Sequence, residues 1–161
     1  MEYKFLSQKF YEDYPEQDYS EIERKDNRPY TMVCLSVNDC IVALPMRSHI
    51  NHNNAYITNR TDNCGIDFSK AVIISNSDYI DNSRKPYIRN NEFAYLKGKD
   101  RILKNKFNRY LQSYIGAKES NDPNRLKRFE YSTLPYFEDV VDYKSLVSNG
   151  IERDSSELIT V

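Results

Sequence analysis

Residues 30–44, YTMVCLSVNDCIVAL, contain two short apolar runs separated by Asn38-Asp39. The first run, 30–37, is rich in residues that favour strands, and the second resumes directly after a pair of turn-forming residues. Two apolar runs around a short polar pair are typical of a β-hairpin. The same reasoning predicts further strand segments elsewhere in the first half, at 3–6, 55–58, 66–68, 71–75 and 79–80.

Helical periodicity replaces the strand pattern in the second half of the chain. Between Asp100 and Gly116 apolar residues recur at three- and four-residue spacing, and the glycine is a natural helix stop. The residues that this helix is expected to bury against the strands are Leu103, Phe107, Tyr110, Leu111 and Tyr114. Shorter helices are expected after the N-cap Ser7, over 91–96, after Asp122-Pro123, and over 136–146.

The order of these elements, strands first and helices afterwards, favours an α+β fold with a mostly antiparallel sheet over a doubly wound fold. A length of 161 residues fits one domain spanning 1–161. No apolar run approaches the roughly 20 residues that span a bilayer, and the N-terminus MEYKFLSQKF lacks the apolar stretch of a signal peptide. Three cysteines without metal spacing indicate thiols. We therefore expect a cytoplasmic protein with no membrane association.

A dense polar cluster follows the second apolar run. Pro45 ends that run, and the next residues are MRSHINHNNAY, which contain both histidines of the chain. The candidate site residues of this segment are Arg47, Ser48, His49, His52 and Asn53. Binding groups are commonly presented in this way, on a loop held by a rigid strand.

The chemistry that fits this cluster without a metal is RNA cleavage by transesterification. The 2′-hydroxyl attacks the phosphate, so the protein needs a base, an acid and a cation for the phosphorane. Histidine titrates near neutral pH, arginine carries a permanent planar charge, and serine and asparagine donate hydrogen bonds. His49 and His52 are three residues apart without a third ligand, which argues against a metal site. No phosphate-binding loop, dinucleotide motif, nucleophile elbow or calcium loop is present, so we expect no cofactor.

The charge of the chain is segregated, although its net value is −1. Residues 84–128 hold thirteen Lys and Arg against four Asp and Glu, so the rest of the chain carries a net charge of −10. Such a local patch is the footprint of nucleic-acid binding, and fourteen tyrosines are available to stack on unpaired bases. The residues expected to contact RNA phosphates are Lys97, Lys99, Arg101, Lys104, Lys106, Arg109 and Arg125.

With these features in place, the chain resembles the toxins of type III toxin–antitoxin systems, the ToxN/AbiQ, TenpN and CptN group, and is most similar to CptN. The resemblance rests on the order of a short N-terminal strand with an aromatic helix, the hairpin, LPMRSHINHNNAY, GIDFSKAVIIS and GKDRILKNKFNRYLQSYI, and it is best between 30 and 115. It implies a compact, twisted antiparallel sheet edged by helices, similar to the Kid and MazF toxins.

The resemblance also implies an activity and a partner. These toxins are metal-independent endoribonucleases that leave a 2′,3′-cyclic phosphate and a 5′-hydroxyl. They are inhibited by a small pseudoknot RNA that the toxin cuts from a repeat precursor, and toxin and RNA alternate in a closed, symmetric complex.

The site residues of the family map onto this chain at one loop. The family has a Pro-x-Thr-Ser-x-Lys pattern after the second hairpin strand, and 45–50 occupies that place here. Ser48 matches the serine, whereas Arg47 stands at the threonine and Ile50 at the lysine, so Arg47 is the substitute cation. Relatives also use an N-terminal tyrosine and a lysine. Tyr30 is our candidate catalytic tyrosine, and the other candidates for these two roles are Tyr3, Lys4 and Tyr11.

Two alternative functions remain open from the sequence. One is a non-catalytic RNA-binding module that uses 84–128 as its contact surface. The other is a protein-binding or structural domain whose tyrosines serve an interface. Each candidate region also has an interpretation without a function. Residues 47–54 would then be an ordinary surface loop, and the charges of 84–128 would lie on solvated helix faces.

Overall fold

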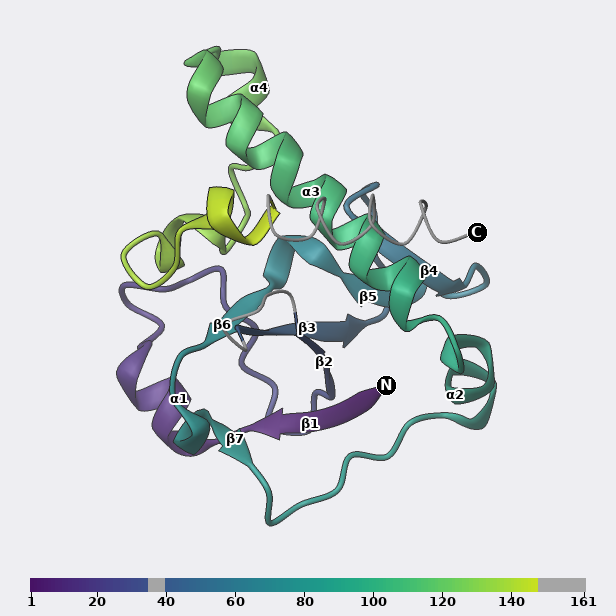
Figure 1. Ribbon diagram of the computed structural model, residues 1–161. Helices are drawn as coiled ribbons and strands as arrows, with labels where there is room; N and C mark the ends of the chain where they lie inside the picture. Colours follow the sequence, from purple (N-terminus) through teal and green to yellow (C-terminus); the bar gives the residue numbers. More distant parts are fainter. Residues whose placement is uncertain (35–39, 148–161) are drawn as a thin grey trace, which may run out of the picture.

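The computed structural model describes residues 1–34 and 40–147 (Figure 1). Its strands form a seven-stranded sheet in the order β4-β5-β3-β2-β1-β7, and β6 pairs with β3 beside this path. All the recorded pairings are antiparallel. The strands are β1 (Glu2–Leu6), β2 (Tyr30–Cys34), β3 (Ile41–Arg47), β4 (Ala55–Asn59), β5 (Cys64–Asp67), β6 (Val72–Ile74) and β7 (Ile80–Asp81). The prediction of an α+β fold with an antiparallel sheet is confirmed.

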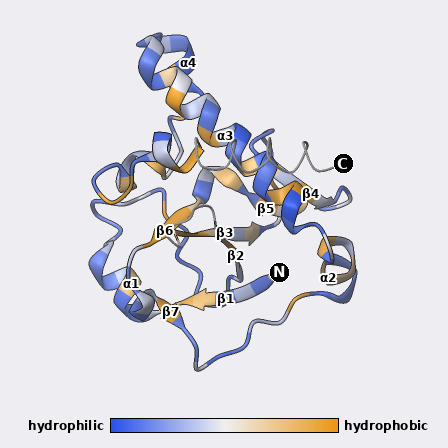
Figure 2. Ribbon diagram, in the orientation of Figure 1, coloured by the Kyte–Doolittle hydropathy of each residue, from blue (hydrophilic) through white to orange (hydrophobic). Residues whose placement is uncertain are grey.

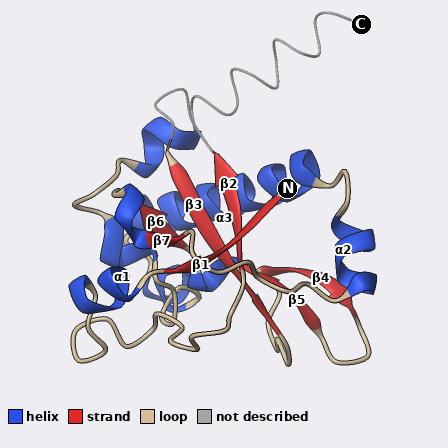
Figure 3. Ribbon diagram, turned by 90° about the horizontal axis from the view of Figure 1, so that it is seen from below, coloured by secondary structure: helices blue, strands red, loops and turns tan. Residues whose placement is uncertain are grey.

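The helices follow the predicted order. They are α1 (Gln8–Asp13), α2 (Asn90–Leu96), α3 (Asp100–Ser120) and α4 (Pro123–Lys127), with 3-10 turns η1 (Phe68–Lys70), η2 (Ser77–Tyr79) and η3 (Leu134–Phe137). Figures 1 and 3 show α3 across one face of the sheet, with α1 and α2 toward opposite ends. The Ser7 side chain caps α1 by accepting from the Phe10 N–H, as predicted. In the described part of the chain, no helix combines the length and apolarity needed to cross a membrane.

The hairpin of β2 and β3 carries the polar segment 47–54, which we call the site loop. Val33 pairs with Val42 and Tyr30 with Pro45, while the predicted turn at 38–39 lies outside the described residues. The apolar run stops at Pro45, but the strand does not, because β3 continues through Arg47. Proline lacks an N–H, so it is tolerated only where the strand needs no ladder donor. The next residue restores the pairing, since the Met46 N–H donates to the Pro29 carbonyl at 3.0 Å.

One side of β3 changes its partner along its length. Its first part, Ile41–Ala43, pairs with β6, and its end, Met46–Arg47, pairs with β5. Between β5 and β6 the chain leaves the sheet as the turn η1, capped by Asp67. This detour places a carboxylate and the η1 residues beside the end of β3, where the polar loop begins.

The long helix α3 extends further than the sequence predicted. It continues one turn past Gly116 to Ser120 and ends at Asn121 in the left-handed conformation, with φ of 51°. Asparagine adopts that conformation more readily than most residues. Gly116 instead lies within the helix beside Arg125: a Cβ there would lie 2.7 Å from the Nη2 atom, so the end of the Arg125 side chain would have to shift.

The predicted apolar face of α3 is confirmed. Leu103, Phe107 and Leu111 are fully buried, and Tyr110 and Tyr114 are nearly so. These side chains join one core cluster with the apolar residues of β2, β3 and β6. Figure 2 shows the matching pattern, with hydrophobic residues along the central strands and hydrophilic residues over much of α3 and α4.

Candidate functional site

A buried carboxylate lies at the centre of the candidate site. Asp67 has no exposed side-chain surface. Its Oδ2 accepts from Nη1 of Arg47 and lies 3.3 Å from Nε2 of His52. Its Oδ1 accepts from the backbone N–H of Ser69 at 2.9 Å and from the Ser69 hydroxyl at 2.6 Å. We call these four residues, Arg47, His52, Asp67 and Ser69, the Asp67 cluster.

Local structure explains why these four residues meet. Arg47 is the last residue of β3, and its Cα is registered with Gly65 of β5, two residues before Asp67. Asp67 then caps η1, which directs Ser69 back toward the same carboxylate. On the other side of β5, Gly65 lets β4 pair closely, because a Cβ there would lie 2.3 Å from the Tyr56 carbonyl oxygen. Sheet register therefore brings two groups 20 residues apart into contact.

His52 is oriented by hydrogen bonds at both ring nitrogens. The Asn54 backbone N–H donates to Nδ1 at 3.1 Å, so in the neutral ring the proton belongs on Nε2. From Nε2 it points to Asp67 at 3.3 Å. The ring is 30% exposed. Because both nitrogens already have protein partners, this arrangement suits a histidine that fixes the loop rather than one that presents a nitrogen to a substrate.

Arg47 is held between two carboxylates. Besides its contact with Asp67, its Nε lies 3.0 Å from Oε1 of Glu23. The other oxygen of Glu23 is 3.5 Å from Nε of Arg28, whose Nη1 donates to the Met46 carbonyl at 2.8 Å. The Arg47 side chain remains 26% exposed. Its guanidinium is thus rigidly placed and partly open to solvent.

A pocket of about 270 Å³ lies on the exposed side of Arg47. The charged residues that line it are four cations and one carboxylate: Lys25, Arg28, Arg47, Arg89 and Glu92. Ser48 and Tyr87 also line it, and Tyr87 is 77% exposed. We call this the arginine pocket. Its excess of guanidinium groups suits an anion such as a phosphate.

His49 differs from His52 in being exposed. Its backbone is in the left-handed region, with φ of 56°, which is uncommon for a residue with a side chain. Two backbone bonds hold this geometry: His49 N–H donates to the Asp62 carbonyl at 2.9 Å, and Ile50 N–H donates to the Asn63 carbonyl at 3.1 Å. The loop therefore presents Ser48 and His49 to solvent while the neighbouring Ile50 is buried.

Tyr30 belongs to the core. Its side chain is fully buried, and its hydroxyl lies 3.5 Å from the Glu23 carbonyl. Burial raises its pKa well above the ordinary value of a tyrosine. A side chain without exposed surface does not reach an RNA strand, so the expected catalytic contact of Tyr30 does not fit this geometry. Tyr30 instead supports the segment that carries Glu23.

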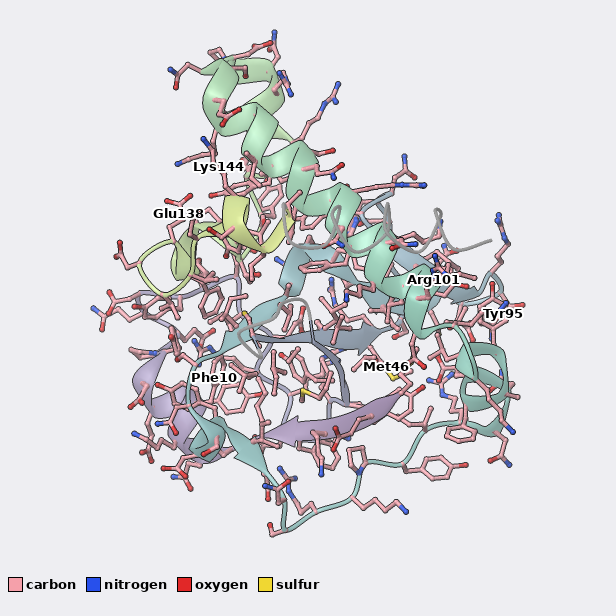
Figure 4. The ribbon with its side chains drawn as sticks, in the orientation of Figure 1. Phe10, Met46, Tyr95, Arg101, Glu138 and Lys144 are labelled. Atoms are coloured by element: carbon pink, nitrogen blue, oxygen red, sulfur yellow. The ribbon has the colours of Figure 1, made fainter. Side chains whose placement is uncertain are left out.

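The expected RNA-contact residues fall into two groups. On and before α3 lie Lys97, Lys99, Arg101, Lys104, Lys106 and Arg109, and two of them meet the polar segment 47–54: a second pocket of about 250 Å³ is lined by Asn53, Lys106 and Arg109 together. Lys97, Arg101 and Lys106 are exposed, whereas Lys99 and Lys104 are half-buried. Figure 4 shows Arg101 near the start of α3 on the same side as Tyr95 of α2.

Arg125 is separate from the other candidates. It packs against Gly116, ten residues along α3 from Lys106, which corresponds to about 15 Å of helix. The helix α4 that carries it lies at the opposite end of α3 from α2 (Figure 1). Arg125 therefore does not join the surface formed by the site loop and the start of α3.

Four residues of the site were not predicted from the sequence: Glu23, Arg28, Asp67 and Ser69. A signal for Asp67 was present, because it interrupts the apolar stretch GIDFSKAVII, and a carboxylate among buried residues requires partners. Glu23 and Arg28 lie in a polar segment expected to be a loop, which has no pattern that singles them out. Their role depends on tertiary contacts alone.

Within residues 1–34 and 40–147, no group of three or more His, Cys, Asp or Glu side chains is arranged to hold a metal ion. The comparisons with known proteins add no assignment: no family model, no curated protein and no solved structure matches this chain.

Proposed function

We propose that this protein is an endoribonuclease that cleaves RNA by attack of the 2′-hydroxyl. The observation that carries the proposal is the position of Arg47. Two carboxylates fix this arginine at the edge of a cation-rich pocket, and the exposed Ser48 and His49 follow it in the chain. Fixed donors aimed at a phosphate are the largest single contribution that a protein makes to this kind of reaction.

The roles follow from exposure and partners. Arg47 and the neighbouring Arg28 and Arg89 stabilise the charge on the phosphorane. Ser48 donates to a non-bridging oxygen or places the 2′-hydroxyl. His49, the exposed histidine, moves protons: the 2′-oxygen loses a proton as it bonds to phosphorus, and the departing 5′-oxygen gains one. His52 holds the loop through Asp67, and Asn53 contacts a neighbouring phosphate from the second pocket.

The wider proposal rests on the resemblance described above. It places the chain among type III toxins with a Kid/MazF-like fold, acting in the cytoplasm on cellular RNA without a metal. The inhibitor is a pseudoknot RNA cut from a repeat precursor, and RNA joins the protein copies into a symmetric complex. If so, light scattering before and after ribonuclease treatment shows the assembly falling to monomers, whereas a protein oligomer that survives complete RNA removal contradicts it.

A non-catalytic RNA-binding module is the second candidate, and one specific observation favours it. Both nitrogens of His52 have protein partners, and the charge of Arg47 is opposed by two carboxylates. A cluster saturated in this way stabilises a binding loop without further chemistry. Under this alternative the protein has salt-sensitive RNA affinity and yields no products.

The two candidates are separated by one cleavage assay in EDTA on a repeat RNA. It compares the wild type with Arg47→Ala, Ser48→Ala, His49→Ala and His52→Ala, after circular dichroism confirms that each is folded. Loss of Arg47 is expected to slow cleavage about a hundredfold or more, comparable to loss of one fixed donor. His49→Ala is expected to lower the rate in the folded protein more than His52→Ala. Cleavage at the wild-type rate by all four variants would place the active site elsewhere, and binding without cleavage would favour the second candidate.

A further inference from the structure

We propose that Tyr56, Tyr95, Lys99 and Lys106 form a platform that stacks an unpaired base of a single RNA strand. The inference rests on the RNA-binding part of the proposed function and assigns a substrate class to a surface outside the Asp67 cluster. We call these four residues the tyrosine platform. They come from three elements and the segment between two of them, so their association is a tertiary feature.

The geometry of the platform is that of two rings side by side, each with an ammonium group near it. The ring centroids of Tyr56 on β4 and Tyr95 on α2 are 6.0 Å apart, with the planes inclined by 44°. The Nζ of Lys106, on α3, lies 5.7 Å from the Tyr56 centroid, and the Nζ of Lys99 lies 5.6 Å from that of Tyr95. Tyr95 is 42% exposed, and Figure 4 shows it at the outer side of the molecule.

The core accounts for part of the Tyr56 ring, which packs against it, but not for Tyr95, which is exposed. Tyr95 lies one residue before Leu96, which is fully buried and fixes the helix, so the exposed tyrosine is not needed to anchor α2. Burial and the adjacent Tyr95 raise the pKa of Tyr56 to about 12, so its phenol stays neutral over the pH range in which RNA is bound. The surface thus offers two aromatic rings within reach of two positive charges.

The lysines do not prevent stacking, because a base binds a ring more strongly than an exposed lysine does. An exposed lysine–ring contact corresponds to an equilibrium factor of about two to five. A stacked base contributes a factor of about five to a hundred. A base therefore displaces the ammonium group from the ring, and the released Lys99 or Lys106 remains close enough to pair with the adjoining phosphate.

The adjoining pocket extends the platform in the direction of the site loop. Lys106 belongs to both, and the pocket adds Arg109 and the amide of Asn53. A guanidinium suits the next phosphate, and an amide both donates to and accepts from a base edge. In duplex RNA the bases are already stacked inside the helix, so a ring platform beside cations selects a single strand.

The test uses the absence of tryptophan from this chain. Tyr95→Trp introduces a single indole that preserves stacking and reports it by fluorescence. The protein is titrated with an oligouridylate of about eight nucleotides, within the range of typical single-strand sites. The matched ligand is an abasic strand with the same number of phosphates. Tyr131→Trp provides the control protein, because Tyr131 is 65% exposed and follows α4.

We expect saturable quenching of Tyr95→Trp by the oligouridylate and affinity at least about fivefold weaker for the abasic strand, the lower limit for one stacked base. Tyr131→Trp is expected to show no quenching. Tyr95→Leu is expected to lose the preference for bases while keeping its affinity for the abasic strand. Equal affinity of Tyr95→Trp for the two strands, or equal quenching in the control, would overturn the platform, since binding would then be purely electrostatic.

Cleavage of a repeat RNA by the same preparations separates this inference from the proposed function. Base-dependent quenching without cleavage supports the platform and contradicts the nuclease. Cleavage by the wild type without base-dependent quenching in Tyr95→Trp contradicts the platform and leaves the nuclease intact.

Discussion

Replacement of Asp67 by asparagine tests whether the buried carboxylate organises the site. In this variant the amide oxygen still accepts from Ser69, but the amide N–H₂ replaces the oxygen that faces Arg47 and His52. Three donors then point at one another where an acceptor is required. Removing one member of a fully buried ion pair costs about 3–5 kcal/mol. Arg47 is 26% exposed and keeps Glu23 as a partner, so we expect a smaller loss, of about 2–3 kcal/mol.

Urea unfolding followed by circular dichroism measures this loss, and a double-mutant cycle identifies its origin. Arg47→Met removes the cation that faces the carboxylate, and combining it with Asp67→Asn removes both charges. We expect the double variant to lose less stability than the sum of the single variants, by about 1–3 kcal/mol, because no unpaired charge remains.

The control is Glu119→Gln. It makes the same change of charge in a pair with Lys144, where the side chains are 56% and 64% exposed, and exposed pairs contribute about 0–1 kcal/mol. If Asp67→Asn unfolds within about 0.5 kcal/mol of the wild type, as a surface substitution does, the carboxylate is not the organising group and our reasoning about the cluster is refuted.

The remaining predictions concern the core, the buried phenols and the basic surface. Phe107→Ala removes a fully buried ring whose centroid lies 5.7 Å from that of Phe68. We expect the free energy of unfolding, measured by a thermal or urea melt, to fall by about 3–5 kcal/mol. An unchanged free energy would contradict the assignment of the buried face of α3. Burial raises the pKa values of Tyr110, Tyr114 and Tyr143 above those of the unfolded chain, so their contribution to stability is complete below pH of about 10 and is lost as pH rises through the folded values. Urea midpoints should therefore fall above that pH, with part of the phenolate absorbance arising only on unfolding. Ionisation of all the phenols of the folded protein with the ordinary midpoint, a pH of about 10, would contradict this. Substituting Lys97, Lys99 and Lys106 together by alanine should make the slope of log affinity against log salt for single-stranded RNA shallower by about 2, whereas an unchanged slope would mean that this surface does not touch phosphates.

The sequence predicted best those parts of the structure that depend on residues close together in the chain. The paired apolar runs predicted the β2–β3 hairpin, and the spacing from Leu103 to Tyr114 predicted the buried face of α3. Both patterns follow from backbone periodicity, which is local. The end of α3 was predicted wrongly, because Gly116 does not end the helix. Gly116 lies within α3 beside Arg125, a contact that the local pattern does not reveal.

In the candidate site, too, features set by local sequence were predicted and features set by distant residues were not. The nearness of Arg47 and His52 follows from their spacing in one loop, and both were predicted as site residues. Their shared partner was not predicted, because Asp67 reaches them only through the register of β5 on β3. Exposure likewise distinguishes His49 from His52 and removes Tyr30 from the surface, and exposure depends on the whole fold.

Cleavage by 2′-hydroxyl transesterification is tested by comparing two strands of the same sequence in EDTA, one an RNA and the other carrying 2′-deoxy sugars throughout. We expect the wild type to cut only the RNA and to leave products that end in a 2′,3′-cyclic phosphate by mass spectrometry. Arg47→Ala is expected to abolish most of this cleavage. Cleavage of the deoxy strand, or cleavage of RNA that requires added Mg²⁺, would contradict this mechanism.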